Sequence, residues 1–251
     1  MRSPAFWRIV ILVIAVLTLE ILCRTGIVDS YTMIPPSMMV VALVDMIRHA
    51  DWFWADASYT FENIAVAITL SIVLGFVFGL VIHALPRFRR VLNPVLLSYY
   101  SVPTFVFYPL LIVIFGIGPT SLIVMGAMFG IVAMISSTLT AIDRIPRVYG
   151  KVARVAGMNT WQTALRIKLP AATPRLFSGL TLAVAYSVTG VIAAEFIIAT
   201  AGLGRQLTLS YNEFDSATMY GLILLILIFA AVSNGLLQSW EARIYRRWYR
   251  S

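Results

Sequence analysis

One segment of the chain carries side chains whose types and spacing suit the docking of a partner. Asn159 can cap a helix through its side chain, and Gln162 three residues later completes a capping-box pattern. In the helix that follows, Trp161, Ala164 and Leu165 share one face at the spacing i, i+3, i+4. A short helix with an apolar face and basic flanks predicts a docking element. An interfacial helix lying on anionic lipid is an equally open interpretation.

Two residues in this segment predict breaks between helices. Gly157 is expected to divide the segment into two short helices. Pro170 is expected to end the second one, because a proline disfavours the helical conformation at the residue before it, here Leu169. The segment is strongly basic, with Arg144, Arg147, Lys151, Arg154, Arg166, Lys168 and Arg175. Two short helices with many basic side chains suggest that the segment binds the surface of a partner or of the membrane.

The sequence contains no pattern for nucleotide binding or for catalysis. Its two lysines, Lys151 and Lys168, do not stand in the Gly-x4-Gly-Lys-Ser/Thr pattern that cradles phosphates. Its two histidines form no His-Glu-x2-His pair, and a single cysteine, Cys23, excludes a disulfide framework. We therefore expect no catalytic residue, metal site or cofactor in this chain.

The elements that position the segment are expected to be membrane helices. The chain has 251 residues, of which 60% are hydrophobic and 12% charged, whereas soluble domains carry about 25% charged residues. Because about 20 apolar residues cross a bilayer as a helix, we predict an all-α integral membrane protein that forms a single transmembrane domain over residues 1–251. Its six transmembrane helices are predicted at residues 6–23, 63–85, 92–115, 120–141, 176–198 and 217–240.

Short motifs predict features between and within these helices. Gly116-Ile117-Gly118-Pro119 predicts the turn between the third and fourth spans. Gly126-x3-Gly130 fits a close contact between helices. Outside the spans, Ile34-Pro35-Pro36-Ser37 predicts a turn, followed by a helix from Met38 to Arg48.

The distribution of positive charge predicts the orientation of these helices. With both termini in the cytoplasm, sixteen of the nineteen basic residues lie in inner segments, as the positive-inside rule requires. Seven of them lie in the long inner loop 142–175. The net charge of +8 therefore indicates orientation and not nucleic-acid binding. The first helix is short enough to be a signal peptide, but no small-x-small cleavage site follows it, so we expect it to be retained.

A few polar residues within the predicted spans are candidates for the translocation path. Glu195 is an intramembrane carboxylate, which favours a functional role, although a hydrogen bond between helices would also explain it. Prolines interrupt the third span, and irregular helix at membrane depth faces protein or a water-filled cavity. Tyr100, Ser101 and Thr104 in that span are therefore predicted to approach the path, with plain helix packing around a kink as the alternative.

The order of motifs along the chain resembles a known family. Ala153, Gly157, Ile167 and Leu169-Pro170 match the EAA loop, Glu-Ala-Ala-x3-Gly-x9-Ile-x-Leu-Pro, of the membrane subunits of bacterial binding-protein-dependent ABC importers. Further similar stretches are Ile34-Pro35-Pro36, Ser101-Val102-Pro103, Pro109-Leu110, Phe115-Gly116-Ile117-Gly118, Ala194-Glu195-Phe196 and Gly202-Leu203-Gly204. Together they resemble the branch that serves taurine, aliphatic sulfonates, nitrate and some pyrimidine or vitamin precursors.

The resemblance implies a non-catalytic permease subunit with type I ABC importer architecture in the bacterial inner membrane. Its implied partners are a second, identical permease subunit, two cytoplasmic ATPase subunits that bind ATP and Mg²⁺, and an external solute-binding protein. It implies contact with the ATPase through Lys151, Ala153, Gly157, Met158, Asn159, Thr160, Trp161, Gln162, Leu165, Leu169 and Pro170.

Lys151 departs from the family pattern, because it stands where the motif has Glu. We expect the partner ATPase to carry a compensating acidic residue. The alternative function is an ion-coupled secondary transporter. That mechanism needs intramembrane ionisable groups, for which Glu195 is the one serious candidate in the sequence.

Overall fold

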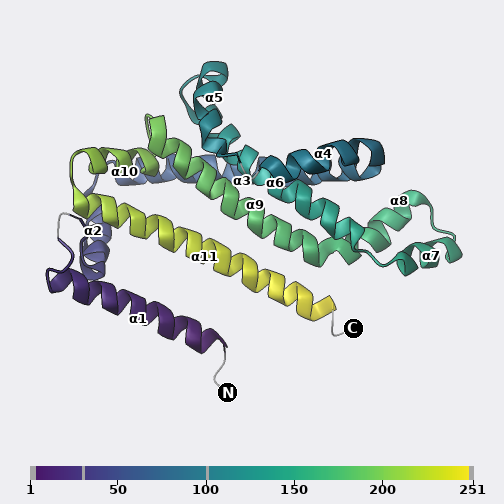
Figure 1. Cartoon of the computed structure of the whole chain (residues 1–251), viewed down its shortest axis with the longest axis horizontal. Helices are drawn as coiled ribbons and strands as arrows, with labels where there is room; N and C mark the ends of the chain where they lie inside the picture. The colour runs from purple at the N-terminus through teal and green to yellow at the C-terminus, as the bar shows by residue number, and fades with distance from the viewer. Residues whose placement is uncertain (1–3, 30–31, 100–101, 249–251) are drawn as a thin grey trace. The chain divides into compact units, whose positions relative to one another are not determined.

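The computed structural model describes residues 4–29, 32–99 and 102–248, and every regular element in these ranges is helical (Figure 1). The α-helices are α1 (Pro4–Arg24), α2 (Pro36–His49), α3 (Phe53–Ala84), α4 (Pro86–Tyr99), α5 (Tyr108–Phe115), α6 (Pro119–Asp143), α7 (Arg147–Val155), α8 (Thr160–Thr163), α9 (Leu169–Ile198), α10 (Leu203–Asn212) and α11 (Ser216–Trp248). A 3₁₀ turn, η1 (Thr104–Phe107), precedes α5, and a π-helical turn, η2 (Ala164–Lys168), joins α8 to α9. The all-α prediction is confirmed.

Among the described residues, four helical stretches are long and apolar enough to cross a membrane: Phe53–Ala84, Pro119–Asp143, Trp161–Ile197 and Ser216–Arg243. They coincide with the second, fourth, fifth and sixth predicted spans, except that the second and fifth spans were each predicted to end one residue later. Each is longer than its predicted span because a run without charges marks the apolar part of a helix and not its ends. In α3, for example, the helix begins ten residues before Asn63 and includes Asp56 in its first turn.

The third predicted span, 92–115, is divided in the structure. α4 ends at Tyr99, and a second helix, α5, begins only at Tyr108 after the turn η1. Prolines explain the interruption, since each lacks a backbone N–H and clashes with the preceding turn of a continuous helix. The turn predicted at residues 116–119 is present, because α5 ends at Phe115 and α6 begins at Pro119.

The chain forms two compact units, one of Met1–Tyr59 with Glu195–Phe229 and one of Thr60–Ala194 with Ala230–Ser251. In the second unit, small residues let α3, α6 and α9 approach closely. The hydroxyl of Ser71 on α3 lies 2.8 Å from that of Ser187 on α9 and 3.2 Å from the carbonyl oxygen of Ala127 on α6. A Cβ atom on Gly130 of α6 would lie only 2.4 Å from the Ser187 hydroxyl oxygen. The helix contact predicted from Gly126-x3-Gly130 is thus confirmed.

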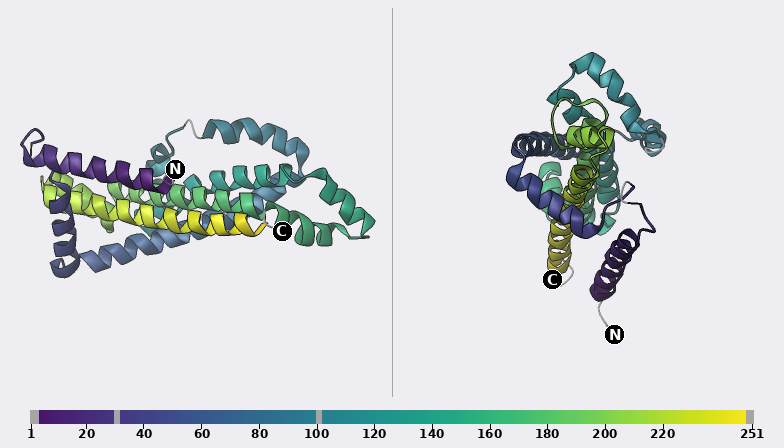
Figure 2. Two further views of the ribbon diagram at one scale, coloured as in Figure 1. Left: turned by 90° about the horizontal axis from the view of Figure 1, so that it is seen from below. Right: turned by 90° about the vertical axis from the view of Figure 1, so that its left-hand side faces the viewer.

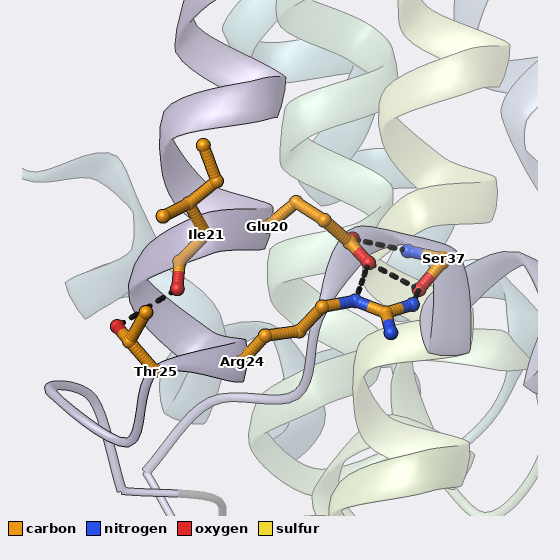
Figure 3. Close-up of polar contacts among 5 residues, drawn as sticks. All are labelled: Glu20, Ile21, Arg24, Thr25 and Ser37. Atoms are coloured by element: carbon orange, nitrogen blue, oxygen red, sulfur yellow. Dashed lines mark hydrogen bonds and ion pairs between the residues drawn. The ribbon is translucent and has the colours of Figure 1, made fainter.

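In the first unit, α1 and α2 are joined through Glu20 (Figure 3). Its carboxylate accepts hydrogen bonds from the backbone N–H of Ser37, over 3.0 Å, and from the Ser37 hydroxyl, over 2.7 Å. The Nε of Arg24, one turn later on α1, lies 2.6 Å from the same carboxylate. Ser37 is in the first turn of α2, where backbone N–H groups lack partners within the helix. Glu20 therefore stabilises the start of the helix predicted after the Ile34–Ser37 turn.

The short helices α7 and α8 extend beyond the ends of α6 and α9, to which they are connected (Figures 1 and 2). α6, α7, α8 and α9 as far as Ala194 belong to the second unit. Residues 144–168, which lie within the predicted inner loop 142–175, therefore form a helical hairpin at one end of the α6–α9 pair.

Candidate functional site

The turn at Gly157 closes α7 with a Schellman motif. The backbone N–H of Met158 donates to the carbonyl oxygen of Ala153 over 3.0 Å, and the N–H of Gly157 donates to that of Arg154 over 3.1 Å. Gly157 has a φ of +64°, and no atom lies within 4 Å of where its Cβ would stand. The glycine is thus required by the backbone conformation and not by packing. The break predicted at this residue is confirmed.

The capping box predicted at Asn159 is also present. The Asn159 side-chain oxygen accepts a hydrogen bond from the backbone N–H of Gln162 over 2.8 Å, and the Gln162 side-chain oxygen accepts one from the backbone N–H of Asn159 over 3.1 Å. Both side chains are exposed. The box satisfies two N–H groups at the helix start within a few residues, which stabilises the start of α8.

The hairpin presents apolar side chains to its surroundings. On α7, Val148, Val152 and Val155 recur at helical spacing and are exposed, Val155 to 91%. After the turn, Trp161 is 72% exposed and Leu165 is 47% exposed. Among the described residues nothing covers these side chains, so the hairpin offers a surface suited to a partner. We call these five residues the docking surface.

The remaining predicted coupling residues surround this surface. Ala153 is 2% exposed and packs inward, whereas Lys151 is exposed. Met158 and Pro170 are half-buried, and Leu169 is exposed. The side chain of Thr160 lies outside the described residues, as do Tyr100, Ser101 and the side chain of Thr104.

Pro170 does not end the second helix, contrary to the expectation from the sequence. Leu169 has helical angles of φ −63° and ψ −49°, and the helix continues through Pro170 into α9. A proline in an α-helix lacks one N–H donor and clashes with the carbonyl four residues earlier. The π-helical turn Ala164–Lys168 directly precedes it. This wider turn accommodates the proline, so the docking surface is joined to α9 by continuous helix.

The base of the hairpin is held by an ion pair that the sequence analysis missed. Asp143, the last residue of α6, accepts both arms of the Arg89 guanidinium, with one N–O distance of 2.8 Å. The hydrogen bond to Asp143 raises the pKa of Arg89, so the guanidinium stays charged. Sequence spacing gave no signal for this pair, since the two residues are 54 positions apart.

Glu195 is 1% exposed and lies against the turn between α9 and α10. It accepts a hydrogen bond from the backbone N–H of Gly204 over 3.1 Å. Asp56, which the sequence analysis did not single out, accepts the backbone N–H of Gly202 over 2.8 Å and the side-chain amide of Gln206. Two buried carboxylates thus satisfy N–H groups at the start of α10, where the helix dipole favours negative charge. These contacts match the hydrogen-bonding alternative for Glu195.

The long apolar helices are those of an α-helical membrane protein, and the hairpin leaves an apolar surface exposed. The chain belongs to the family described as binding-protein-dependent transport system inner membrane component, which it matches over residues 68–249. This agrees with the resemblance inferred from the motifs.

Two curated relatives are similar over part of their length. The riboflavin transport system permease protein RibX of Chloroflexus aurantiacus is 31% identical over 161 residues, which cover 61% of this chain and 60% of RibX. The taurine transport system permease protein TauC of Escherichia coli is 31% identical over 163 residues, covering 64% and 58%. The chain thus spans about 60% of the length of these two relatives.

The fold is similar to that of a solved membrane transporter. A chain of the inward-facing MetNI methionine ABC transporter superposes with a TM-score of 0.63 at 19% sequence identity. The superposition covers 76% of this chain and 96% of that one. It supports the all-helical permease fold independently of close sequence similarity.

Proposed function

We propose that this chain is the transmembrane subunit of an ATP-driven importer and that its docking surface binds a cytoplasmic ATPase. The observation that carries the proposal is the exposed apolar hairpin, held by its own Schellman turn and capping box and joined without a break to α9. A free apolar surface on a locally stabilised hairpin is suited to insertion into a groove of a partner.

The connections of the hairpin supply the mechanism. One end leaves α6 and the other continues into α9, and these two helices pack closely with α3. A displacement of the hairpin by the ATPase is therefore transmitted to the membrane helices as movement of whole helices. ATP must favour one orientation of the permease through its differential binding free energy. The chain has no phosphate-cradling loop of its own, so ATP and Mg²⁺ are bound by the partner and the permease is non-catalytic.

The family membership and the charge pattern support a proposal for the full assembly. It comprises six crossings with both termini in the cytoplasm, a second identical permease subunit, two ATPase subunits and an external binding protein, in the bacterial inner membrane. RibX and TauC are named for transport of riboflavin and taurine, which supports a small solute as cargo. Tyr100, Ser101, Thr104 and Glu195 remain the proposed residues of the translocation path.

Removal of the largest docking side chain tests the proposal. The chain is co-expressed with the ATPase encoded nearest to it in its genome, and co-purification is quantified for Trp161→Ala. A buried interface tryptophan contributes about 2 kcal/mol or more, so we expect at least a tenfold loss of ATPase binding. Trp54→Ala is the matched control, because Trp54 is 66% exposed on α3. ATPase binding that is equal in both variants would exclude docking at this surface.

Energy coupling separates this function from the ion-coupled alternative. In proteoliposomes containing permease, ATPase and binding protein, transport of the solute should require ATP on the side of the membrane that carries the ATPase. It should continue when the proton gradient is collapsed. Uptake driven by the gradient without ATP would support the secondary transporter instead.

A further inference from the structure

A polar cavity of about 330 Å³ lies where α6 ends and α9 begins. It is lined by Ser136, Ser137, Thr140, Arg144, Arg175 and Ser178. All six residues belong to the second unit. The lining therefore carries two guanidinium groups and four hydroxyls, and no carboxylate is part of it.

The two arginines are available to a ligand. Neither Arg144 nor Arg175 forms an ion pair or a side-chain hydrogen bond within the part of the chain that the structure describes. The acidic neighbour of Arg144 in the sequence, Asp143, is already bound by both arms of Arg89. Both arginines line one cavity, and neither is neutralised by an ion pair among the described residues.

Two of the four hydroxyls are available as donors. Thr140 donates its hydroxyl to the carbonyl oxygen of Ser136 over 2.8 Å, and Ser178 donates to the carboxylate of Glu241 on α11. The hydroxyls of Ser136 and Ser137 make no hydrogen bond among the described residues. The cavity therefore offers two neutral O–H donors beside two charged, planar N–H donors, and guanidinium groups bind oxyanions in bidentate fashion.

We propose that this cavity binds a small oxyanion, such as a sulfonate, sulfate, phosphate or carboxylate group. The C-terminal end of α6 contributes a partial charge of about −0.5, which opposes an anion. The carboxylate of Glu241, which accepts a hydrogen bond from Ser178, adds one more negative charge at the edge of the cavity. One arginine would be outweighed by these two contributions together, whereas two arginines leave the cavity with a small positive charge that favours an anion.

The position of the cavity connects it to the docking surface. Arg144 lies at the end of α6 from which the hairpin departs, and Arg175 lies on α9, into which the hairpin returns. An anion bound by both arginines would link the two helices, α6 and α9, from which the hairpin extends. Its binding must then be coupled to ATPase docking with the same coupling free energy in both directions. Interpretation of the anion as a solute leaving the permease rests on the proposed function, whereas anion binding itself does not.

Sulfate binding to the full chain tests the proposal. The chain is placed in nanodiscs of phosphatidylcholine alone, and radiolabelled sulfate is titrated by equilibrium dialysis. We expect one saturable site, weakened at least tenfold by Arg144→Gln or by Arg175→Gln, and weakened less by Arg→Lys at either position. Arg154→Gln is the matched control, because Arg154 is exposed on α7 outside the cavity. Absence of saturable binding, or an equal loss in Arg154→Gln, would overturn the proposal.

Two further arms distinguish the source of the anion and guard against misfolding. Competition by 20% phosphatidylglycerol in the nanodisc would identify a lipid headgroup as the occupant, and displacement by taurine alone would identify a free solute; either supports the oxyanion site. Thermal unfolding of each variant confirms that it is folded. If sulfate fails to bind while Trp161-dependent ATPase docking persists, the oxyanion site is wrong and the proposed function stands. If sulfate binds but the ATPase does not dock, the oxyanion site stands and the proposed function is wrong.

Discussion

The backbone N–H of Met158 donates to the carbonyl oxygen of Ala153, five residues earlier, over 3.0 Å. This bond forms only because Gly157 between them adopts a φ of +64°. The exit direction of the chain from α7, and with it the position of Trp161, therefore depends on one glycine.

Gly157→Ala should weaken the coupling of ATP hydrolysis to transport while leaving membrane insertion intact. An L-residue in this left-handed conformation costs about 1–2 kcal/mol, and the site has no neighbour that would clash. The turn is thus destabilised and the membrane core is not. ATP hydrolysed per solute transported is the measurement.

Gly150→Ala is the matched control for this substitution. Gly150 lies inside α7 with open space at its Cβ position and no positive φ, so alanine should be tolerated or favoured there. Transport by Gly157→Ala at the wild-type ratio of ATP to solute would show that the docking assignment is wrong.

Lys151→Glu should weaken assembly with the ATPase. Lys151 is exposed on α7, beside the valines of the docking surface, and its charge is opposite to that of the family motif. If the partner supplies an acidic residue, the reversal replaces attraction by repulsion. A loss of about tenfold in affinity is expected, measured by binding of ATPase to permease nanodiscs.

Arg48→Glu, an equal change of charge at an exposed position on α2, should leave ATPase binding unchanged. Restored binding when an acidic residue of the ATPase is changed to lysine would locate the partner of Lys151. Unchanged or improved assembly of Lys151→Glu would reject the compensating-charge hypothesis.

Gly202→Ala should lower the thermal stability of the permease. Gly202 has a φ of +104°, and a Cβ there would lie 2.6 Å from the carboxyl carbon of Glu195. With a ψ of 165°, Gly202 lies in a region that only glycine adopts readily, so the substitution combines backbone strain of about 1–3 kcal/mol with displacement of a buried carboxylate from its hydrogen bond to Gly204.

Gly26→Ala separates these two effects in a thermal melt. Gly26 also has a positive φ, +73°, but no atom lies within 4 Å of its Cβ position. We expect the melting temperature to fall further for Gly202→Ala. Equal shifts would mean that the contact with Glu195 contributes nothing beyond the backbone.

Gly130→Ala should destabilise the packing of α3, α6 and α9. Its Cβ would lie 2.4 Å from the hydroxyl oxygen of Ser187 and 2.5 Å from that of Ser71. Overpacking of this kind costs about 1–3 kcal/mol. Unfolding in detergent by increasing denaturant, followed by tryptophan fluorescence, measures the change.

Gly235→Ala on α11 provides the comparison, because nothing lies within 4 Å of its Cβ position. That variant should be as stable as the wild type or more so. If Gly130→Ala unfolds at the same denaturant concentration as Gly235→Ala, the close approach of the three helices does not contribute to stability.

The residues that sequence reasoning placed correctly act over short distances along the chain. The Asn159–Gln162 capping box, the turn at Gly157 and the turn at residues 116–119 each depend on groups within about five positions. The apolar lengths of the four long helices were visible for a similar reason, because hydropathy is a property of consecutive residues.

The tertiary structure decided what depends on distant partners. Asp56 meets Gly202 across 146 positions, Arg89 meets Asp143 across 54, and Arg144 and Arg175 come to line one cavity. Pro170 continues a helix that its local preference would end, because the π turn before it accommodates the ring. By itself, the sequence determined the membrane class, the candidate docking segment and its local turns. Only the packing of the helices decided which charged side chains are paired and which are not. A buried charge is stabilised by partners that lie far away in the sequence, and their spacing does not reveal the pairing.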